Sequence, residues 1–246
     1  MGVTEGTQAR WGGAFATLAC ALSVLSLLIL GRSVLAMTYL NVRFHDEVDP
    51  LSRAVSYYVF AERAAEVFVA TLVAVATATL AILAGLAQLR VRLGPRAVAL
   101  LIGWSVALLL CAAFPTDNSP RIETGSGWIH QFAGASLFVT LPLAGLAAAT
   151  SLRGQPGWAG TARLLRRLAL GGVVLASAYL VARLPDLLPW WQLPGVLDFS
   201  AISGLVQRGL FALELATLLA LAARLLRVSW SAARQASRDR PRAVAR

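Results

Sequence analysis

The chain has 246 residues, of which 58% are hydrophobic and only 14% are charged, and its mean hydropathy is +0.69. Soluble domains are about 45–50% apolar and about 25% charged. The composition therefore excludes a disordered, fibrous or disulfide-framework protein and predicts an integral membrane protein.

The basic residues need a separate explanation, because 22 arginines against 12 acids give a net charge of +10 and there is no lysine. A nucleic-acid-binding protein would gather its arginines on a folded surface with aromatic residues between them. Here the arginines flank apolar runs instead. Membrane topology explains them better, and we expect no nucleic-acid partner.

Six apolar runs approach the roughly 20 residues that a transmembrane helix needs. They lie at about residues 12–36, 67–89, 97–114, 129–150, 168–184 and 204–223. The runs are too long for barrel strands and lack their alternation, so they should be helices, which satisfy their own backbone groups. We expect an all-α polytopic bundle of six transmembrane helices, with a single domain over residues 1–228 and a basic tail at 229–246.

The distribution of arginines predicts the orientation of this bundle. If the N-terminus is cytoplasmic, the cytoplasmic segments hold 15 of the 22 arginines but only two acids. Because basic residues concentrate in short cytoplasmic loops, both termini should be cytoplasmic, with the bundle in the plasma membrane. The first run exceeds the roughly 7–15 residues of a signal-peptide core, so we expect it to remain as a span.

Membrane lipids are the partners that this arrangement predicts. Seven arginines follow Ala223, and each is worth about 1 kcal/mol near anionic headgroups, so the tail should lie on the inner leaflet. Small residues recur every four positions in the second span, at Ala70, Ala74 and Ala78. This spacing allows close helix packing and leaves self-association open.

Polar residues gather in the outer segments. The first of these, about residues 37–66, holds His45, Asp46, Asp49, Ser52 and Tyr57, the second runs from Asp117 to His130, and the third from Pro185 to about Ser203 contains Trp190 and Trp191. Any polar site is therefore expected to face outward.

His130 and Asp117 are the candidate catalytic residues. Histidine titrates near pH 6.5 and a neighbouring carboxylate can hold its tautomer, so the two could act as an acid–base pair. The alternatives are zinc binding with Asp46 or Asp49, although the spacing matches no dedicated metal motif, and a structural, hydrogen-bonded His130. Two histidines are too few for the axial ligands of a two-haem cytochrome. We expect no cofactor and no metal.

The sixth span carries two charged residues, Arg208 and Glu214. A charge within a span is costly unless it is paired or hydrated. Six residues correspond to about 120° of helix rotation, so these two side chains should not face each other. We expect Arg208 to pair with an outer carboxylate, Asp117 in first place, and Glu214 to be protonated or paired. They could form a substrate or proton site, or clamp helices together.

Several motifs together carry a family resemblance. They are Phe114-Pro115-Thr116-Asp117, then Gly127-Trp128-Ile129-His130, with the stretch Asp49 to Tyr58, Leu141-Pro142 and Gly204 to Arg208. In this order on six spans they resemble the DUF998 family of six-helix bacterial membrane proteins, over nearly the whole chain. Family members often read Ser-Asp where this chain has Ser56-Tyr57.

The resemblance implies a six-helix bundle but no known activity. It places Asp117, His130 and Arg208 on positions that match the family pattern. The chain also has a more distant likeness to the Frag1/DRAM/Sfk1-type membrane proteins, which implies a lipid-related or regulatory role by analogy of fold alone.

Our leading hypothesis is a non-enzymatic membrane protein that binds lipid or partner helices. Its outward polar cluster would serve as structural glue or as a ligand site, with the members Asp49, Ser52, Tyr57, Arg208 and Glu214. One alternative is an enzyme that acts on an outer-leaflet lipid through His130 and Asp117, with Arg208 holding an anionic headgroup. A second is a small transporter that uses Glu214. Convergence of Asp117, His130 and Arg208 in one pocket would favour a ligand site.

Overall fold

The computed structural model describes residues 2–119, 122–182 and 200–244, with side chains described at 13–119, 122–181 and 201–238. The long helices are α1 (Gly2–Arg43), α2 (Ala64–Gln88), α3 (Pro95–Ala113), α4 (Gly125–Leu152), α5 (Ala159–Ala182) and α7 (Ser203–Val244). Two short 3₁₀ segments, η1 (Val55–Phe60) and η3 (Ser200–Ile202), lie between them. Within the described ranges there is no strand, and the predicted all-α class is confirmed.

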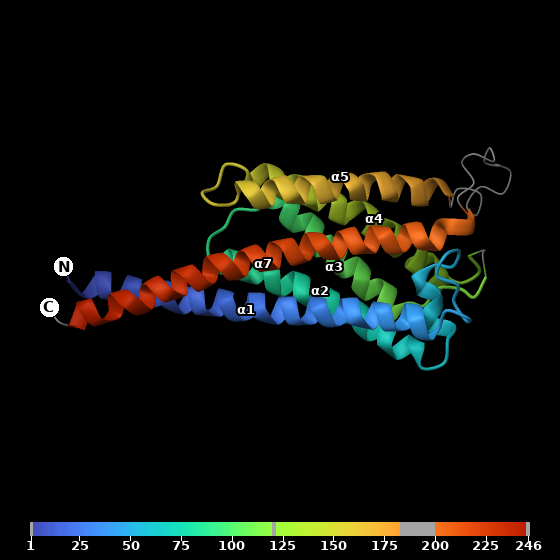
Figure 1. Cartoon of the computed structure of the whole chain (residues 1–246), viewed down its shortest axis with the longest axis horizontal. Coiled ribbons are helices and arrows are strands. Elements are labelled where there is room, and N and C mark those ends of the chain that lie inside the picture. Colours follow the sequence, from blue (N-terminus) through green and yellow to red (C-terminus); the bar gives the residue numbers. More distant parts are fainter. Residues whose placement is uncertain (1, 120–121, 183–199, 245–246) are drawn as a thin grey trace.

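The helices form a ring in which each packs antiparallel on the next in chain order and α7 closes against α1. Both chain ends lie at one end of the bundle, which we call the proximal end (Figure 1). The loops at 44–63, 114–119 and 122–124 form the opposite, distal end. At the proximal end, α1 and α7 extend past the other four helices. That the proximal end is cytoplasmic stays a prediction.

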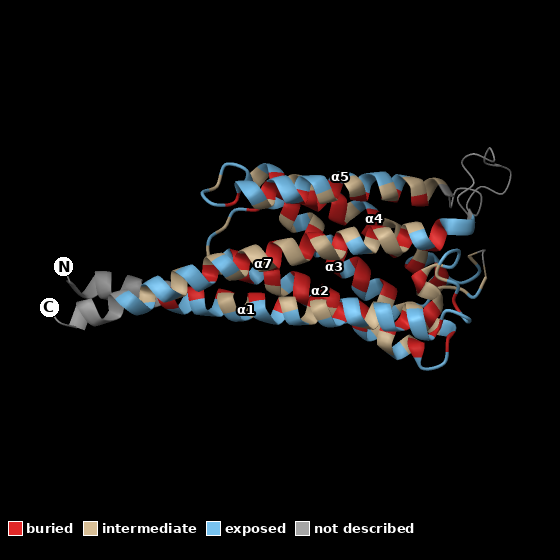
Figure 2. Ribbon diagram, viewed as in Figure 1, coloured by how far each residue is buried: buried red, intermediate tan, exposed pale blue. Residues whose placement is uncertain are grey.

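Figure 2 shows that the helices bury the faces that point into the ring and expose the faces that point outward. Many of the residues on the exposed faces are large and apolar. Leu28, Leu35, Val42 and Val174 each expose 66–71% of their surface. Water-soluble proteins rarely expose apolar patches of this extent. All six long helices are apolar and long enough to cross a bilayer. The architecture is therefore that of a multipass membrane protein.

In the proximal half of the bundle, glycine and proline residues shape a tight turn and a close contact between two helices. Gly94 adopts a φ of 81° as the cap of α3, and Pro95 occupies the first helical position, where its missing N–H costs nothing. Pro142 lies inside α4 and faces α5. A Cβ atom at Gly172 would come within 3.0 Å of the Pro142 ring, so glycine lets α5 pack at this distance.

The helix ends differ from the predicted spans. α1 continues to Arg43 rather than ending near residue 36, and α5 starts at Ala159 rather than near 168. A hydropathy window finds only the part of a helix that crosses hydrocarbon, whereas polar residues can continue the helix beyond it. For the same reason α7 continues as a helix through the basic segment. Most of the third outer segment, including Trp190 and Trp191, lies outside the described residues.

Candidate functional site

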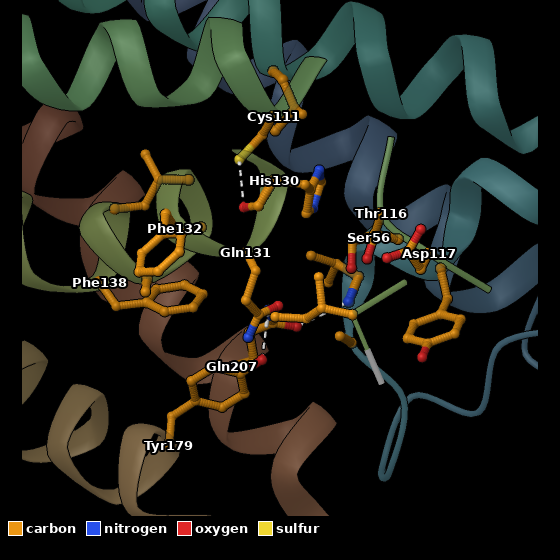
Figure 3. Close-up of a pocket in the computed structure, with 18 of the residues that line it drawn as sticks. Ser56, Cys111, Thr116, Asp117, His130, Gln131, Phe132, Phe138, Tyr179 and Gln207 are labelled. Carbon is orange, nitrogen blue, oxygen red and sulfur yellow. Dashed lines mark hydrogen bonds between the residues drawn. The ribbon is translucent and has the colours of Figure 1, made fainter. Parts of the chain in front are cut away.

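A cavity of about 140 Å³, the distal cavity, opens among η1, α2, α3, α4, α5 and α7 (Figure 3). Its polar lining comprises Ser56, Tyr57, Thr116, Asp117, Ser119, His130, Gln131, Tyr179 and Gln207. Gln207 lies about 6 Å along α7 from its start, whereas Phe211 lies about 12 Å along it and Phe138 about 20 Å along α4. The cavity therefore has a polar mouth and an apolar floor.

His130 lies in the second turn of α4 and is buried, with 6% of its surface exposed. Its Nδ1 lies 2.8 Å from the carbonyl oxygen of Phe114. Because a carbonyl oxygen only accepts, Nδ1 donates, and the neutral ring keeps Nε2 as an acceptor. The backbone of Cys111, one turn earlier at the end of α3, also forms a hydrogen bond with the ring. The His130 ring thus lines the distal cavity while the backbone at the end of α3 holds it in place.

Asp117 caps the start of α4. Its carboxylate accepts the hydroxyl of Thr124 at 2.6 Å and the backbone N–H groups of Glu123 and Thr124 at 2.8 and 3.2 Å. Thr124 in turn accepts the N–H of Gly127 at 2.9 Å. These bonds, that from the Thr124 hydroxyl first, hold the pKa of Asp117 below its usual value. A carboxylate here also neutralises the positive end of the helix dipole.

The two candidate catalytic residues therefore line one cavity without contacting each other through a hydrogen bond. His130 bonds to Phe114, and Asp117 bonds to the loop and to Thr124. The direct pair that the sequence suggested is not formed, because each side chain fixes its own segment of backbone. A catalytic role for either residue stays a prediction. Across the described parts of the chain, no three His, Cys, Asp or Glu side chains gather as metal ligands.

Arg208 does not pair with Asp117, so this prediction is wrong. Its guanidinium instead donates to neutral oxygens, namely Asn41 Oδ1, the hydroxyl of Tyr58 and the carbonyls of Pro50, Arg53 and Gly204. The loop after α1 folds over the start of α7 and turns its carbonyl groups toward the arginine, so neutral oxygens accept the hydrogen bonds of the guanidinium, and the Asp49 carboxylate lies near enough to interact with its charge. Arg208 does not line the distal cavity.

Asp49 and Ser52 belong to the same loop. Asp49 accepts the Ser52 hydroxyl and the N–H of Leu51, and these bonds, with a smaller contribution from the nearby Arg208 charge, lower its pKa. The Ser203 hydroxyl of α7 donates to the Ser52 carbonyl at 3.0 Å. Together with Arg208 these contacts form a clamp that holds the first loop against α7. Of the predicted polar cluster, only Tyr57 lines the distal cavity.

Glu214 lies deeper and apart from the other predicted residues. It is 2% exposed, and neither carboxyl oxygen has a hydrogen-bond partner among the described residues. It lines a second cavity of about 50 Å³ together with Trp104, whose indole N–H also lacks a partner there. Phe68 and Phe211 line both cavities and thus separate them. Of the two states expected for Glu214, protonated or paired, the paired one is not found in the described part of the chain.

Two uncharged residues of the distal cavity, Gln207 and Gln131, were not among the predicted site residues. Gln207 accepts the N–H of Val55 at 2.8 Å and donates to the hydroxyl of Tyr179 at 3.3 Å, which joins the first loop, α7 and α5 at the cavity. Gln131 reaches toward the same point from α4 (Figure 3). The sequence did contain a signal for Gln207, because it is an amide inside an apolar run beside Arg208. A search limited to ionisable groups does not find such a residue.

The fold and its cavities define a six-helix integral membrane protein with a cavity at the end opposite its termini. The chain belongs to the DUF998 family, whose description is "protein of unknown function", and the family model matches residues 28–224. This match covers α2 to α5 in full, α1 from residue 28 on, α7 up to residue 224, and with them the clamp and both cavities. Comparisons with curated proteins and with solved structures find no match.

Proposed function

We propose that this protein binds an amphiphilic lipid in the distal cavity without changing it chemically. The observation that carries the proposal is the polar mouth above an apolar floor, because a ligand with a hydrogen-bonding headgroup and a hydrocarbon chain matches both. A volume of about 140 Å³ can hold a headgroup's reactive end or the start of a chain, since an engineered cavity of about 150 Å³ holds benzene.

The rest of such a lipid can leave the cavity along α4. Trp128 and Phe132 both line the cavity and expose 49% and 66% of their surface. Their rings stack with centroids 5.4 Å apart. Aromatic side chains favour the boundary between headgroups and hydrocarbon. This pair therefore supports an opening toward the lipid at the distal interface.

The chemistry of the mouth favours an uncharged headgroup. The Asp117 carboxylate already accepts three hydrogen bonds, and the Arg208 guanidinium is held in the clamp. The side chains left for a ligand are neutral, chiefly those of His130 and Gln131. A hydroxyl-bearing headgroup, such as that of a diacylglycerol or a neutral glycolipid, can both donate and accept here.

We place the protein in the plasma membrane of a bacterium with both termini in the cytoplasm, so that the distal cavity opens to the outer leaflet. The support is the charge distribution, because the proximal loops and the end of α7 carry most of the arginines. The distal loops carry most of the acids.

A lipid-modifying enzyme is the second candidate. The observation in its favour is that His130, a residue type that commonly acts as a general base, lines the cavity. Against it, no carboxylate bonds to the histidine ring, and Arg208 cannot hold an anionic headgroup from its place in the clamp.

Two glycines offer a matched test of the binding proposal. Gly134 lines the distal cavity, and a Cβ atom built there meets no atom within 4 Å, so the side chain of Gly134→Phe has room to start into the cavity and should fill it. Gly103 is equally open but lies exposed on α3 away from the cavity. The three proteins are purified in mild detergent, and their bound lipids are quantified by mass spectrometry.

We expect the wild type and Gly103→Phe to retain one class of uncharged lipid at near-stoichiometric amounts, and Gly134→Phe to lose at least about nine-tenths of it. Equal lipid in all three proteins would refute the proposal. His130→Gln should still bind the lipid. If an unmodified lipid accumulates only in cells with His130→Gln, the protein is an enzyme instead.

A further inference from the structure

One arginine lies well inside the apolar part of α1. The hydroxyl of Ser26 donates to the carbonyl of Ala78 at 3.2 Å. This bond shows which residues of α1 and of the antiparallel α2 lie at the same height along the bundle axis. Arg32 is six residues further along α1 and is therefore level with Leu72. This position is about 12 Å from the distal end of α2 and about 24 Å from its proximal end. Arg32 thus lies at a depth where the bilayer is hydrocarbon.

The Arg32 side chain is exposed on the outer surface of the ring and makes no hydrogen bond or ion pair with any described residue. Side chains on a helix lean toward its N-terminus, which for α1 is the proximal end. Arg32 therefore leans away from the nearer headgroups, which opposes snorkelling. Charged residues at this depth almost always face the bundle interior or a partner, and Arg32 faces neither within this chain.

The surface around Arg32 has the form of a helix-packing seam. Leu28, Leu35 and Tyr39 expose 67%, 71% and 52% of their surface, and with Arg32 they follow a spacing of three and four residues. A Cβ atom built at Gly31 would meet nothing within 4 Å, so this position is open, and because glycine has no side chain a second helix can approach closely there. We call Leu28, Gly31, Arg32, Leu35 and Tyr39 the α1 face.

We propose that the α1 face binds a transmembrane helix of another protein that carries an aspartate or glutamate at the depth of Arg32. The carboxyl group would neutralise the arginine, and Gly31 would let the two helices approach. A polar residue at one seam position also fixes the register of a helix pair.

A second copy of this chain does not fit the α1 face. A twofold contact through this face would set one Arg32 against the other. Glu214, the acid that lies deep in the described spans, is 2% exposed and cannot be presented to a neighbour. The partner is therefore a different protein, recognised by its acid.

The proposal is tested with the full-length protein in phosphatidylcholine vesicles. A donor fluorophore on its N-terminus is titrated with acceptor-labelled polyleucine transmembrane peptides that carry glutamate, leucine or lysine at the centre. We expect energy transfer to show at least tenfold tighter binding of the glutamate peptide than of the leucine peptide, which is about 1.4 kcal/mol. Arg32→Leu should abolish this preference, and Arg32→Glu should transfer it to the lysine peptide.

Arg43→Leu is the matched control, because it removes an arginine at the distal end of the same helix and should leave the preference intact. Equal binding of the glutamate and leucine peptides to the wild type would overturn the proposal. So would a preference that survives Arg32→Leu. An Arg32-dependent enrichment of phosphatidylglycerol around the protein, with no peptide preference, would show that the arginine binds a lipid headgroup instead.

Discussion

Replacing Arg208 with alanine should be among the most destabilising single changes at the distal end. The guanidinium donates five hydrogen bonds to the first loop, α1 and its own helix. Hydrogen bonds from a charged donor are each worth about 1.5–3 kcal/mol, but bonds from one side chain are not additive. The bonds to Asn41 and Tyr58 are partly buried, and their loss alone sets the lower bound for the decrease in the free energy of unfolding. We expect Arg208→Ala to reduce the free energy of unfolding by about 3–5 kcal/mol.

Double-mutant cycles, measured by reversible unfolding in detergent, locate the partner of Arg208. Asn41 Oδ1 accepts from both Arg208 and Tyr58, so Arg208→Ala and Asn41→Ala together should cost at least about 1 kcal/mol less than their sum. Arg208→Ala and Asp117→Ala should be additive within about 0.5 kcal/mol. Coupling to Asp117 without coupling to Asn41 would refute the clamp.

Three further predictions follow from single groups. Asp117 has a lowered pKa in the folded protein, so its stabilising contribution is complete above the unfolded value of 3.8 and is lost as the pH falls below it. Unfolding measured at about pH 6 and about pH 3 should show a smaller loss of stability for Asp117→Asn than for the wild type. Glu214→Leu should raise the free energy of unfolding by about 1–3 kcal/mol, because it removes a buried carboxyl group without a partner; a decrease would show that the carboxyl group binds something. Reporter domains fused after residue 246 and inserted near Glu123 should report the cytoplasm and the outside respectively, and the same side for both would exclude the proposed orientation.

The helices could be predicted from the sequence because the signal is local. An apolar run of sufficient length must satisfy its backbone groups within itself when it enters a membrane. Six spans place both termini at the same end, and the three spans before Asp117 and His130 place these two residues at the opposite end. The helix ends were less predictable, since hydropathy does not register that α1 continues through polar residues to Arg43.

The contacts of the site could not be predicted in the same way. A sequence shows which residues carry charge, so Asp117 was the natural partner for Arg208. It does not show that the loop after α1 turns the carbonyl groups of Pro50 and Arg53 toward the guanidinium. Backbone carbonyls are present at every position, and only the fold decides which of them converge.

The most direct test of lipid binding uses a photo-crosslinking amino acid at Gly134, in the distal cavity, and at Gly103, on the outer face of α3. Both positions are open enough to accept the probe. After irradiation of intact membranes, the probe at Gly134 should form adducts with one class of uncharged lipid, whereas adducts at Gly103 should follow the bulk lipid composition. Identical adducts at the two positions, or none at Gly134, would contradict the proposal that the distal cavity is a lipid site.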